Sequence, residues 1–348
     1  MTDASGPIEP LGRPGWPALD RLAFERLTAL HRRELKLHCY RMMGSLHEAD
    51  DLVQDTLLSA WRARSQFDGR GSARGWLYTI ATNSCLNAIK ARSAARRLLK
   101  QPEQTPSDGP ATGGPVIDLP WLEPYPDAEL PDVVDQTPGP EARYEAREAV
   151  RLAFVAAIQL LPPRQRAALL LCDVLGWSAI ETAQLLGGTT ASINSALQRA
   201  RTTLGARYRQ GRLPQRSQPD AEEGLLLERY MHAWQADNLD GLVDLLREDA
   251  IYHMPPWREW YRGRPAIGAF LASVWGNFAG YRAVAIAANG QPAVAVYALG
   301  RDDLAWRAHS LHVIEPADGK IASLTIYVPP LAPRLFPAFG LSPEPGVT

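Results

Sequence analysis

The sequence predicts a multi-domain chain of 348 residues that is mostly α-helical and ends in an α+β domain shaped like a cone. Two observations predict the all-α part: apolar residues recur at helical spacing in two blocks, and a proline-rich stretch separates these blocks. A third predicts the cone, because the last third of the chain passes from helices to strand-like runs joined by turn sequences. We expect a disordered N-terminus at 1–19, domains at 20–100, 141–209 and 222–340, and linkers at 101–140 and 210–221.

Charge is unevenly distributed along the chain, although the net charge is only −1. Residues 69–102 contain seven Lys or Arg and no acidic residue, and residues 182–219 contain six Arg and no acidic residue. Residues 101–140 show the reverse, with eight Asp or Glu and no basic residue. Basic blocks on expected helices favour a polyanionic partner such as nucleic acid.

Cysteine usage and hydropathy exclude several classes of protein. The three cysteines form neither a CxxC pair nor a disulfide framework. No run approaches the roughly 18 apolar residues of a membrane span, and residues 1–20 lack the apolar core of a signal peptide. We therefore expect a soluble, cytoplasmic protein with no membrane partner. His31, His38 and Cys39 share one expected helix but lack the paired spacing of a zinc site, so no metal or other cofactor is expected.

The first helical block, residues 22–64, predicts two helices with a break at Gly44-Ser45. The second of these helices has an apolar face and an acidic face. The acidic face carries Asp51, Gln54 and Asp55. Acidic residues early in a helix also complement its dipole, which is the structural alternative to a binding surface.

A glycine-containing loop and a basic, aromatic helix follow. Ser72 suits the N-cap of this helix, which we expect from residue 73 to about 100. The candidates for nucleic-acid contact combine aromatic rings, amides and cations; they are Phe67, Arg70, Trp76, Tyr78, Asn83, Asn87 and Lys90. Such side chains can hold an unstacked base and a single-stranded backbone. A place in the core explains Trp76 equally well.

Residues 101–140 are predicted to be a linker, since ten prolines and four glycines prevent regular helix or sheet. Within the linker, Leu119-Pro-Trp-Leu-Glu-Pro-Tyr125 forms an apolar island that fits a short docking motif. A disordered tether with incidental aromatic residues is the alternative.

The second helical block predicts four helices, at residues 141–160, 163–175, 178–186 and 190–208. Gly187-Gly188 permits a sharp turn between the last two, and the small Ala183 lets them approach, as in a helix-turn-helix. The outer side of the last helix carries candidate major-groove contacts: Ser192, Asn194, Ser195, Gln198, Arg199 and Arg201. Gln can read adenine and Arg can read guanine.

These motifs resemble a known family. The pattern F-x-G-x-G-S-x-x-x-W-L-x-x-I-A-x-N, from Phe67 to Asn83, is similar to domain two of bacterial sigma factors, and residues 161–204 are similar to domain four. The chain is thus identified as a member of the small alternative sigma factors of the extracytoplasmic-function class. The resemblance implies binding to core RNA polymerase through Asp51, Gln54 and Asp55.

The resemblance further implies that promoter DNA is the nucleic-acid partner. The loop and third-helix candidates would contact the minus-10 element, and the outer side of the helix-turn-helix would contact the minus-35 element. Three positions depart from the family pattern: Asn87 stands where many relatives have Asp, and Asn194 and Ala196 replace basic residues. The base preference therefore cannot be carried over, and weaker DNA affinity outside the polymerase complex is expected.

The last domain predicts helices at residues 222–236, 239–246 and 264–275. Strands are expected at 250–254, 281–288, 293–299, 304–315 and 321–328, with turns at Asn289-Gly290 and Asp318-Gly319. The run from Ala250 to Ile267 resembles the SnoaL-like branch of the ketosteroid-isomerase and nuclear-transport-factor superfamily. That resemblance extends from Gly224 to Gly340.

A pocket is expected inside the cone. Strict alternation places Trp306, Ala308, Ser310, His312 and Ile314 on one sheet face. The candidate pocket residues are His253, Trp257, Trp260, His312 and Tyr327. An isomerase of this fold needs a carboxylate base, and a carboxylate pair in the central strands would supply it. Residues 304–314 and 321–328 contain no Asp or Glu, so we expect no catalytic residue and no enzyme.

Three functions stay open for the cone: regulatory packing against the sigma domains or polymerase, which we favour, sensing of a small-molecule ligand, and catalysis. For the whole chain, we predict an alternative sigma factor regulated in cis by this domain. The alternative is a polymerase-independent helix-turn-helix regulator with a ligand-sensing pocket.

Overall fold

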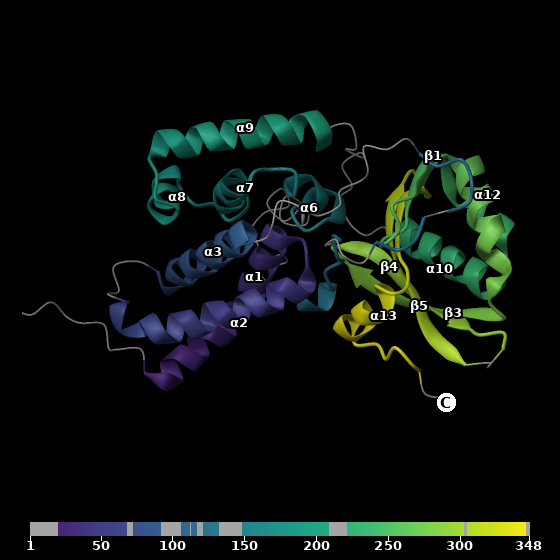
Figure 1. The fold of residues 1–348 in the computed structure, drawn as a ribbon, viewed down its shortest axis with the longest axis horizontal. Helices are drawn as coiled ribbons and strands as arrows, with labels where there is room; N and C mark the ends of the chain where they lie inside the picture. The colour runs from purple at the N-terminus through teal and green to yellow at the C-terminus, as the bar shows by residue number, and fades with distance from the viewer. Residues whose placement is uncertain are drawn as a thin grey trace, which may run out of the picture.

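The computed structural model describes residues 20–67, 72–91, 106–111, 113–116, 121–131, 148–208, 221–302 and 305–345. These residues form two all-α domains and one α+β domain. Figure 1 shows the helices of the two all-α domains on one side of the molecule and the sheet of the α+β domain on the other.

The first helical domain contains α1 (Arg21–Met43), α2 (Leu46–Ala63) and α3 (Ala73–Ala91). Gly44 ends α1 with a φ of 75°, and Ser45 caps α2 by accepting a hydrogen bond from Glu48 N. The predicted pair of helices with a break at Gly44-Ser45 is confirmed. Residues 92–100 of the predicted third helix lie outside the described residues.

The second helical domain contains α6 (Leu152–Ile158), α7 (Pro163–Leu169), α8 (Ala179–Leu186) and α9 (Thr190–Tyr208). Proline suits the first position of α7, where its missing N–H has no intrahelical partner. A π-helical segment, Leu170–Val174, continues α7 and accounts for the longer helix that the sequence predicts. The predicted helix at 190–208 is confirmed, whereas residues 141–147 lie outside the described part of the chain.

The C-terminal domain contains α10 (Ala221–Gln235), α11 (Leu239–Asp244), α12 (Arg264–Val274) and a six-stranded sheet. The strands are β1 (Leu246–His253), β2 (Trp260–Arg262), β3 (Gly280–Ala288), β4 (Gln291–Leu299), β5 (Trp306–Ala317) and β6 (Lys320–Tyr327). The sheet order is β2-β1-β6-β5-β4-β3, with β1 and β6 parallel and the other neighbours antiparallel. The predicted meander is confirmed from β3 to β6, while β2 and the parallel pairing were not predicted.

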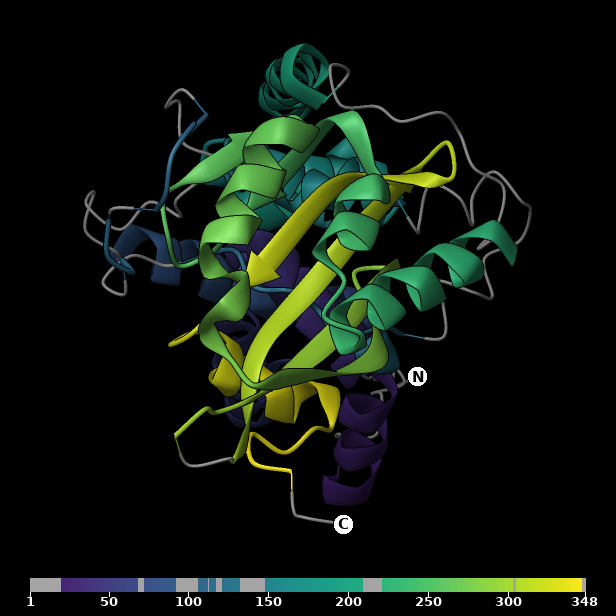
Figure 2. The same cartoon turned by 90° about the vertical axis from the view of Figure 1, so that its right-hand side faces the viewer.

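Both faces of this sheet are buried. Helices α10 and α12 cover one face, here called the inner face, as Figure 2 shows. The opposite, outer face packs against α13 (Ala332–Leu335), Phe336 and Leu152 of α6. The C-terminal segment of the domain therefore covers part of this face, and Leu152 brings a helical domain into the same cluster.

Candidate polymerase and nucleic-acid interfaces

Helix α2 presents the predicted polymerase contacts to solvent. Asp51, Gln54 and Asp55 are exposed, and their spacing puts them on one stripe of the helix. Leu52 and Val53 lie between them in sequence and are buried in the domain core. The packing of α2 therefore uses the opposite side, which leaves the acidic stripe accessible to a partner.

Helix α3 presents a second exposed stripe. Asn83, Asn87 and Lys90 are exposed and follow one another at helical spacing. Trp76, two turns before Asn83, is half-buried, and its ring lies 5.1 Å from the ring of Phe67. An aromatic pair followed by amides and a cation suits a single-stranded nucleic acid, whose bases stack and whose phosphates are anionic.

Tyr78 does not belong to this stripe. It is 1 % exposed, its hydroxyl donates a 3.2 Å hydrogen bond to Glu34, and burial raises its pKa. Its ring lies 6.1 Å from that of Trp177 in the second helical domain. The sequence placed Tyr78 among the DNA contacts, but here it is a core residue beside the contact between the two helical domains. Arg70 lies outside the described residues.

The two histidines of α1 make structural contacts. His31 pairs with Glu34, whose carboxylate also binds Arg74 of α3. His38 lies 2.9 Å from Thr82 Oγ1, and burial lowers the pKa of His38 to about 3. Among the residues that the structure describes, no group of three side chains could hold a metal ion.

Helices α8 and α9 form the predicted helix-turn-helix. Ser178 and Glu181 cap α8 reciprocally, and Gly187 ends it with a φ of 63°. Ile193 and Leu197 bury the inner side of α9. All six predicted contacts on its other side are exposed: Ser192, Asn194, Ser195, Gln198, Arg199 and Arg201.

Arg201 already has a partner within the chain. Its Nε and Nη2 donate to the carboxylate of Asp173 at 3.0 and 2.7 Å. This two-pronged pair fixes the guanidinium group against the segment that follows α7. Any DNA group that binds Arg201 must therefore compete with Asp173.

A buried arginine joins the two helical domains. Arg166 of α7 donates to the carbonyl oxygens of Met42 in α1 and Ile158 in α6, and to the side chain of Gln159. Gln159 in turn donates to the carbonyl oxygen of Arg41 at 2.9 Å. A buried cation is unfavourable without such acceptors, so these bonds favour one relative placement of the two domains.

Three of the five predicted pocket residues lie on the outer face of the sheet. His253 and Trp260 are register partners with rings 5.8 Å apart, whereas Tyr252, the neighbour of His253, packs on the inner face. Tyr327 pairs with Leu311 and packs with it on the outer face. The prediction that these three residues line a pocket inside the cone is wrong, because adjacent strand residues point to opposite faces.

A bulge in β5 corrects the predicted face of two further residues. The register along β4 steps from Ser310 to Ala308, so His309 is an extra residue with no register partner on β4. Trp306 and Ala308 therefore pack on the outer face, whereas strict alternation from His312 predicts the inner one.

His312 and Trp257 are the predicted pocket residues that do pack on the inner side. His312 is fully buried, with Nδ1 2.7 Å from the Tyr230 hydroxyl and Nε2 2.6 Å from Ser310 Oγ. The Trp234 ring lies 5.1 Å from the His312 ring. Burial lowers the pKa of His312, so the imidazole is neutral and forms part of a packed aromatic core.

Comparisons with known proteins agree with this three-part architecture. Family models match residues 27–95 (Sigma-70 region 2), 151–204 (Sigma-70, region 4) and 227–324 (SnoaL-like domain). The ECF RNA polymerase sigma factor SigG of Mycobacterium tuberculosis (strain H37Rv) is 42% identical over 348 residues, covering 98% of this chain and 90% of SigG. The chain belongs to the extracytoplasmic-function sigma factors. It is an alternative sigma factor, which directs RNA polymerase to promoters.

Two further relatives extend the comparison. SigM of Mycobacterium tuberculosis (strain H37Rv) is 29% identical over 185 residues, covering 53% of this sigma factor and 76% of SigM. The crystal structure of SigJ from Mycobacterium tuberculosis covers 92% of this chain and 99% of its own, with a TM-score of 0.55 at 22% identity. SigJ therefore shares the fold. Within the described part of this sigma factor, no helix is both long and apolar enough to span a bilayer.

The turn between β3 and β4 of this sigma factor is buried where three segments meet. Asn289 is 0 % exposed, with a φ of 58°. Its Nδ2 donates to the Tyr40 hydroxyl at 3.0 Å and to the Val150 carbonyl at 2.8 Å, and its Oδ1 accepts from Tyr125 N at 2.8 Å. One side chain thus joins α1, the linker and the start of the second helical domain. The sequence predicted Asn289 only as a turn residue.

The linker island is docked on the first helical domain. The Glu123 carboxylate accepts hydrogen bonds from Ser45 Oγ at 2.9 Å, Leu46 N at 2.6 Å and His47 N at 3.3 Å. A carboxylate at this position complements the positive end of the α2 dipole. The described part of the predicted docking motif, residues 121–125, is therefore docked and is not a free tether.

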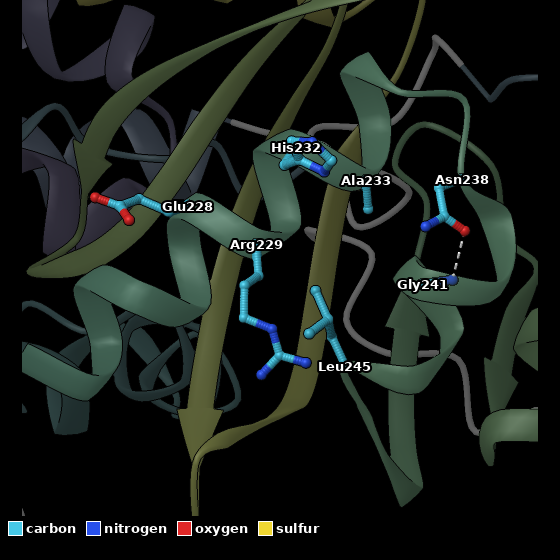
Figure 3. Close-up of a pocket in the computed structure, with 7 residues that line it drawn as sticks. All are labelled: Glu228, Arg229, His232, Ala233, Asn238, Gly241 and Leu245. Carbon is cyan, nitrogen blue, oxygen red and sulfur yellow. Dashed lines mark hydrogen bonds between the residues drawn. The ribbon is translucent and has the colours of Figure 1, made fainter.

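An open hollow of about 510 Å³ lies on the outside of the C-terminal domain. Figure 3 shows its lining, which comes from α10 and from the residues around α11: Glu228, Arg229, His232, Ala233, Asn238, Gly241 and Leu245. Asn238 Oδ1 caps α11 by accepting from Gly241 N at 2.9 Å. None of the predicted pocket residues lines this hollow.

Proposed function

We propose that the C-terminal domain regulates this sigma factor in cis, by holding the two helical domains and the linker in one closed arrangement. The observation that carries the proposal is Asn289, whose buried amide binds α1, the linker and the second helical domain together. A side chain that serves only a turn would project into solvent and need no such partners.

Three neighbouring contacts support the same role. Gln291 accepts from Leu152 N at 3.0 Å, and Gly290 N donates to Asp127 at 2.8 Å. Arg151 forms an ion pair with Glu315 of β5 at 3.6 Å. In the closed arrangement, Arg166 and Tyr78 also lie in the contact between the two helical domains. Release of the Asn289 turn should therefore weaken that contact as well.

The test is transcription by purified core polymerase with wild-type protein and with Asn289→Gly. Glycine keeps the left-handed backbone and removes only the amide, so the C-terminal domain should stay folded. Loss of the three hydrogen bonds leaves buried polar groups unpaired, which weakens closure by about 2–3 kcal/mol. We expect more transcription from the variant at equal protein concentration. If Asn289→Gly separates the C-terminal domain from the helical domains but gives the same transcription as wild-type protein, the proposal is contradicted.

The proposed contact residues combine the exposed stripes and the half-buried pair of Phe67 and Trp76 with Arg70, which is kept from the family pattern. Asp51, Gln54 and Asp55 bind core polymerase, the minus-10 contacts are Phe67, Arg70, Trp76, Asn83, Asn87 and Lys90, and the minus-35 contacts lie on α9. Combining Asp51→Ala with Asp55→Ala should weaken polymerase binding at least tenfold, whereas Ser59→Ala, at an exposed position on the same helix, is the matched control. Equal affinity for all three proteins would contradict this assignment.

We propose that the C-terminal domain acts without catalysis. Ser310 and His312 form a close pair, but both are fully buried and no substrate could reach them without opening the core. A small-molecule ligand is the second candidate, because Trp275 Nε1 and the Tyr261 hydroxyl are buried without a hydrogen-bond partner in the described residues. Native mass spectrometry of freshly purified protein tests this candidate by detecting any co-purified molecule.

A further inference from the structure

The linker touches the C-terminal domain at a second place, remote from Asn289. There, residues 106–111 and 113–116, here called the strap, run along the loop before β2 and the start of that strand. Three backbone N–H groups of the strap donate hydrogen bonds, from Ser107 to Trp260 O, from Gly113 to Glu259 Oε1 and from Val116 to Pro256 O, each 2.8 Å long. The strap runs antiparallel to residues 256–260, because its later residues bind the earlier acceptors.

The position of this site favours the capture of a peptide. In the described part of the sheet, β2 is an edge strand with β1 on one side, and on its other side the Trp260 carbonyl accepts from the strap, as an edge strand does with an added chain. Ala111 of the strap also packs against the inner-face cluster. Arg258 and Arg262 are exposed beside the site and complement the charge of Asp108, the acidic residue of the strap.

The site selects glycine at one position of its ligand. A Cβ atom on Gly113 would lie 2.6 Å from Glu259 Oε1, the atom that accepts the Gly113 N–H. A side chain there must push the carboxylate away and so removes the hydrogen bond. The flexible Glu259 side chain can move, so this loss does not strain the fold. At Gly114 a Cβ would meet no atom within 4 Å, which makes it a matched control.

The strap is bound far more shallowly than the docked island. Pro106, Asp108, Gly113 and Gly114 are exposed, whereas Tyr125 is 0 % exposed. The three N–H bonds, a 2.7 Å hydrogen bond from Trp121 Nε1 to Val116 O and one small apolar contact hold the strap, so little buried area opposes its release.

We propose that the loop before β2 and the β2 edge form a peptide-binding site of the C-terminal domain, with the strap as its exchangeable ligand. The ligand class is an extended peptide rich in glycine and proline, which the site recognises through backbone hydrogen bonds and a glycine opposite Glu259. This inference deepens the proposed regulation in cis, because it names a peptide as the molecule that the domain binds.

Hydrogen exchange on the full chain tests whether the strap is held. We expect the amides of Ser107, Gly113 and Val116 to be protected in wild-type protein and in Gly114→Ala, and to exchange at least tenfold faster in Gly113→Ala. Equal exchange in all three proteins would overturn the proposal. Amides of the docked island around Tyr125 should not change, because their partners lie elsewhere.

A synthetic peptide of residues 105–117 tests exchange in trans. The full-length Gly113→Ala protein, whose own strap is weakened, should bind the labelled wild-type peptide at least tenfold more tightly than wild-type protein does, because the tethered strap competes at high effective concentration. A peptide that carries Gly113→Ala should bind at least tenfold more weakly. Equal binding of both peptides, or no binding to either protein, would overturn the peptide site.

These readouts are independent of transcription. If the strap exchanges as expected but Asn289→Gly leaves transcription unchanged, the peptide site stands and the proposed regulation fails. If Asn289→Gly activates transcription while the strap shows no protection, the regulation stands and the peptide site fails.

Discussion

The two faces of the C-terminal sheet differ in what covers them. The inner face packs against α10 and α12 of its own domain, with an aromatic core that includes Trp234 and Trp275, 4.8 Å apart. The outer face packs against α13 and against Leu152 of a helical domain. A change on the inner face should therefore unfold the domain, and a change on the outer face should release it from the helical domains.

Acidification should have the largest effect and act more strongly on the inner face. Burial lowers the pKa of His309 to about 4 and that of His312 also below its usual value, whereas the outer face has one such residue, His253, at about 4. The unfolded chain binds these protons first as the pH falls, so the stability present above about pH 6.5 is lost toward pH 4. Each histidine contributes about 1.4 kcal/mol per pH unit.

Denaturant unfolding at several pH values measures this slope. Between about pH 6 and 5, the free energy of unfolding of the C-terminal domain should fall by on the order of 3–4 kcal/mol for its three histidines together. His312→Gln should reduce the slope by about one third, and His232→Gln, at an exposed position, is the matched control. A stability that stays constant from pH 7 to 5 would contradict the prediction.

Trp234→Ala should have the next largest effect, smaller than the stability lost over the whole range from about pH 6.5 to 4. The indole packs against Trp275, Tyr281 and His312, so its removal leaves a cavity in the inner-face core. We expect a loss of about 3–5 kcal/mol in the free energy of unfolding of the C-terminal domain, measured by denaturant titration. A loss below about 1 kcal/mol for Trp234→Ala would show that the core does not depend on this ring.

Leu152→Ala should weaken the contact between domains without unfolding the sheet. Leu152 is 7% exposed and belongs to α6, but it packs in the outer-face cluster. The expected cost is about 2 kcal/mol. Limited proteolysis should cut the linkers faster, while hydrogen exchange in β4 and β5 stays slow. Faster exchange in β4 and β5 would mean that the contact on the outer face cannot be weakened without destabilising the sheet itself.

The ion pair between Arg151 and Glu315 should have the smallest effect. Its atoms are 3.6 Å apart and both side chains are partly exposed, which corresponds to less than about 1 kcal/mol. A double-mutant cycle with Arg151→Gln and Glu315→Gln measures the coupling free energy. A coupling free energy above about 2 kcal/mol would mean that this ion pair, and not Asn289, is the main contact between the C-terminal domain and the helical domains.

The helices and their caps could be predicted from the sequence because local patterns determine them. Apolar spacing and Gly44-Ser45 marked α1 and α2, and Gly187-Gly188 marked the turn of the helix-turn-helix. The exposed stripes on α2 and α9 followed from the same spacing. Tyr78 was misplaced because aromatic residues suit both a core and a DNA surface, and only tertiary packing against Trp177 decides between them.

The faces of the sheet could not be predicted, because they depend on long-range pairing. The extra residue His309 reverses the side of Trp306 and Ala308, and no local signal marks this bulge. The role of Asn289 could not be predicted for a similar reason. Asn289-Gly290 indicates a hairpin turn, but no nearby residue shows that a distant helix and the linker cover this turn.

Asn289 and its partner Tyr125 are 164 residues apart. At a synthesis rate of about 5–20 residues per second, a ribosome needs roughly ten to thirty seconds to pass from one to the other. During that time both helical domains leave the ribosome before the turn that joins them exists. Each new molecule therefore has both helical domains before the Asn289 hydrogen bonds that join them can form.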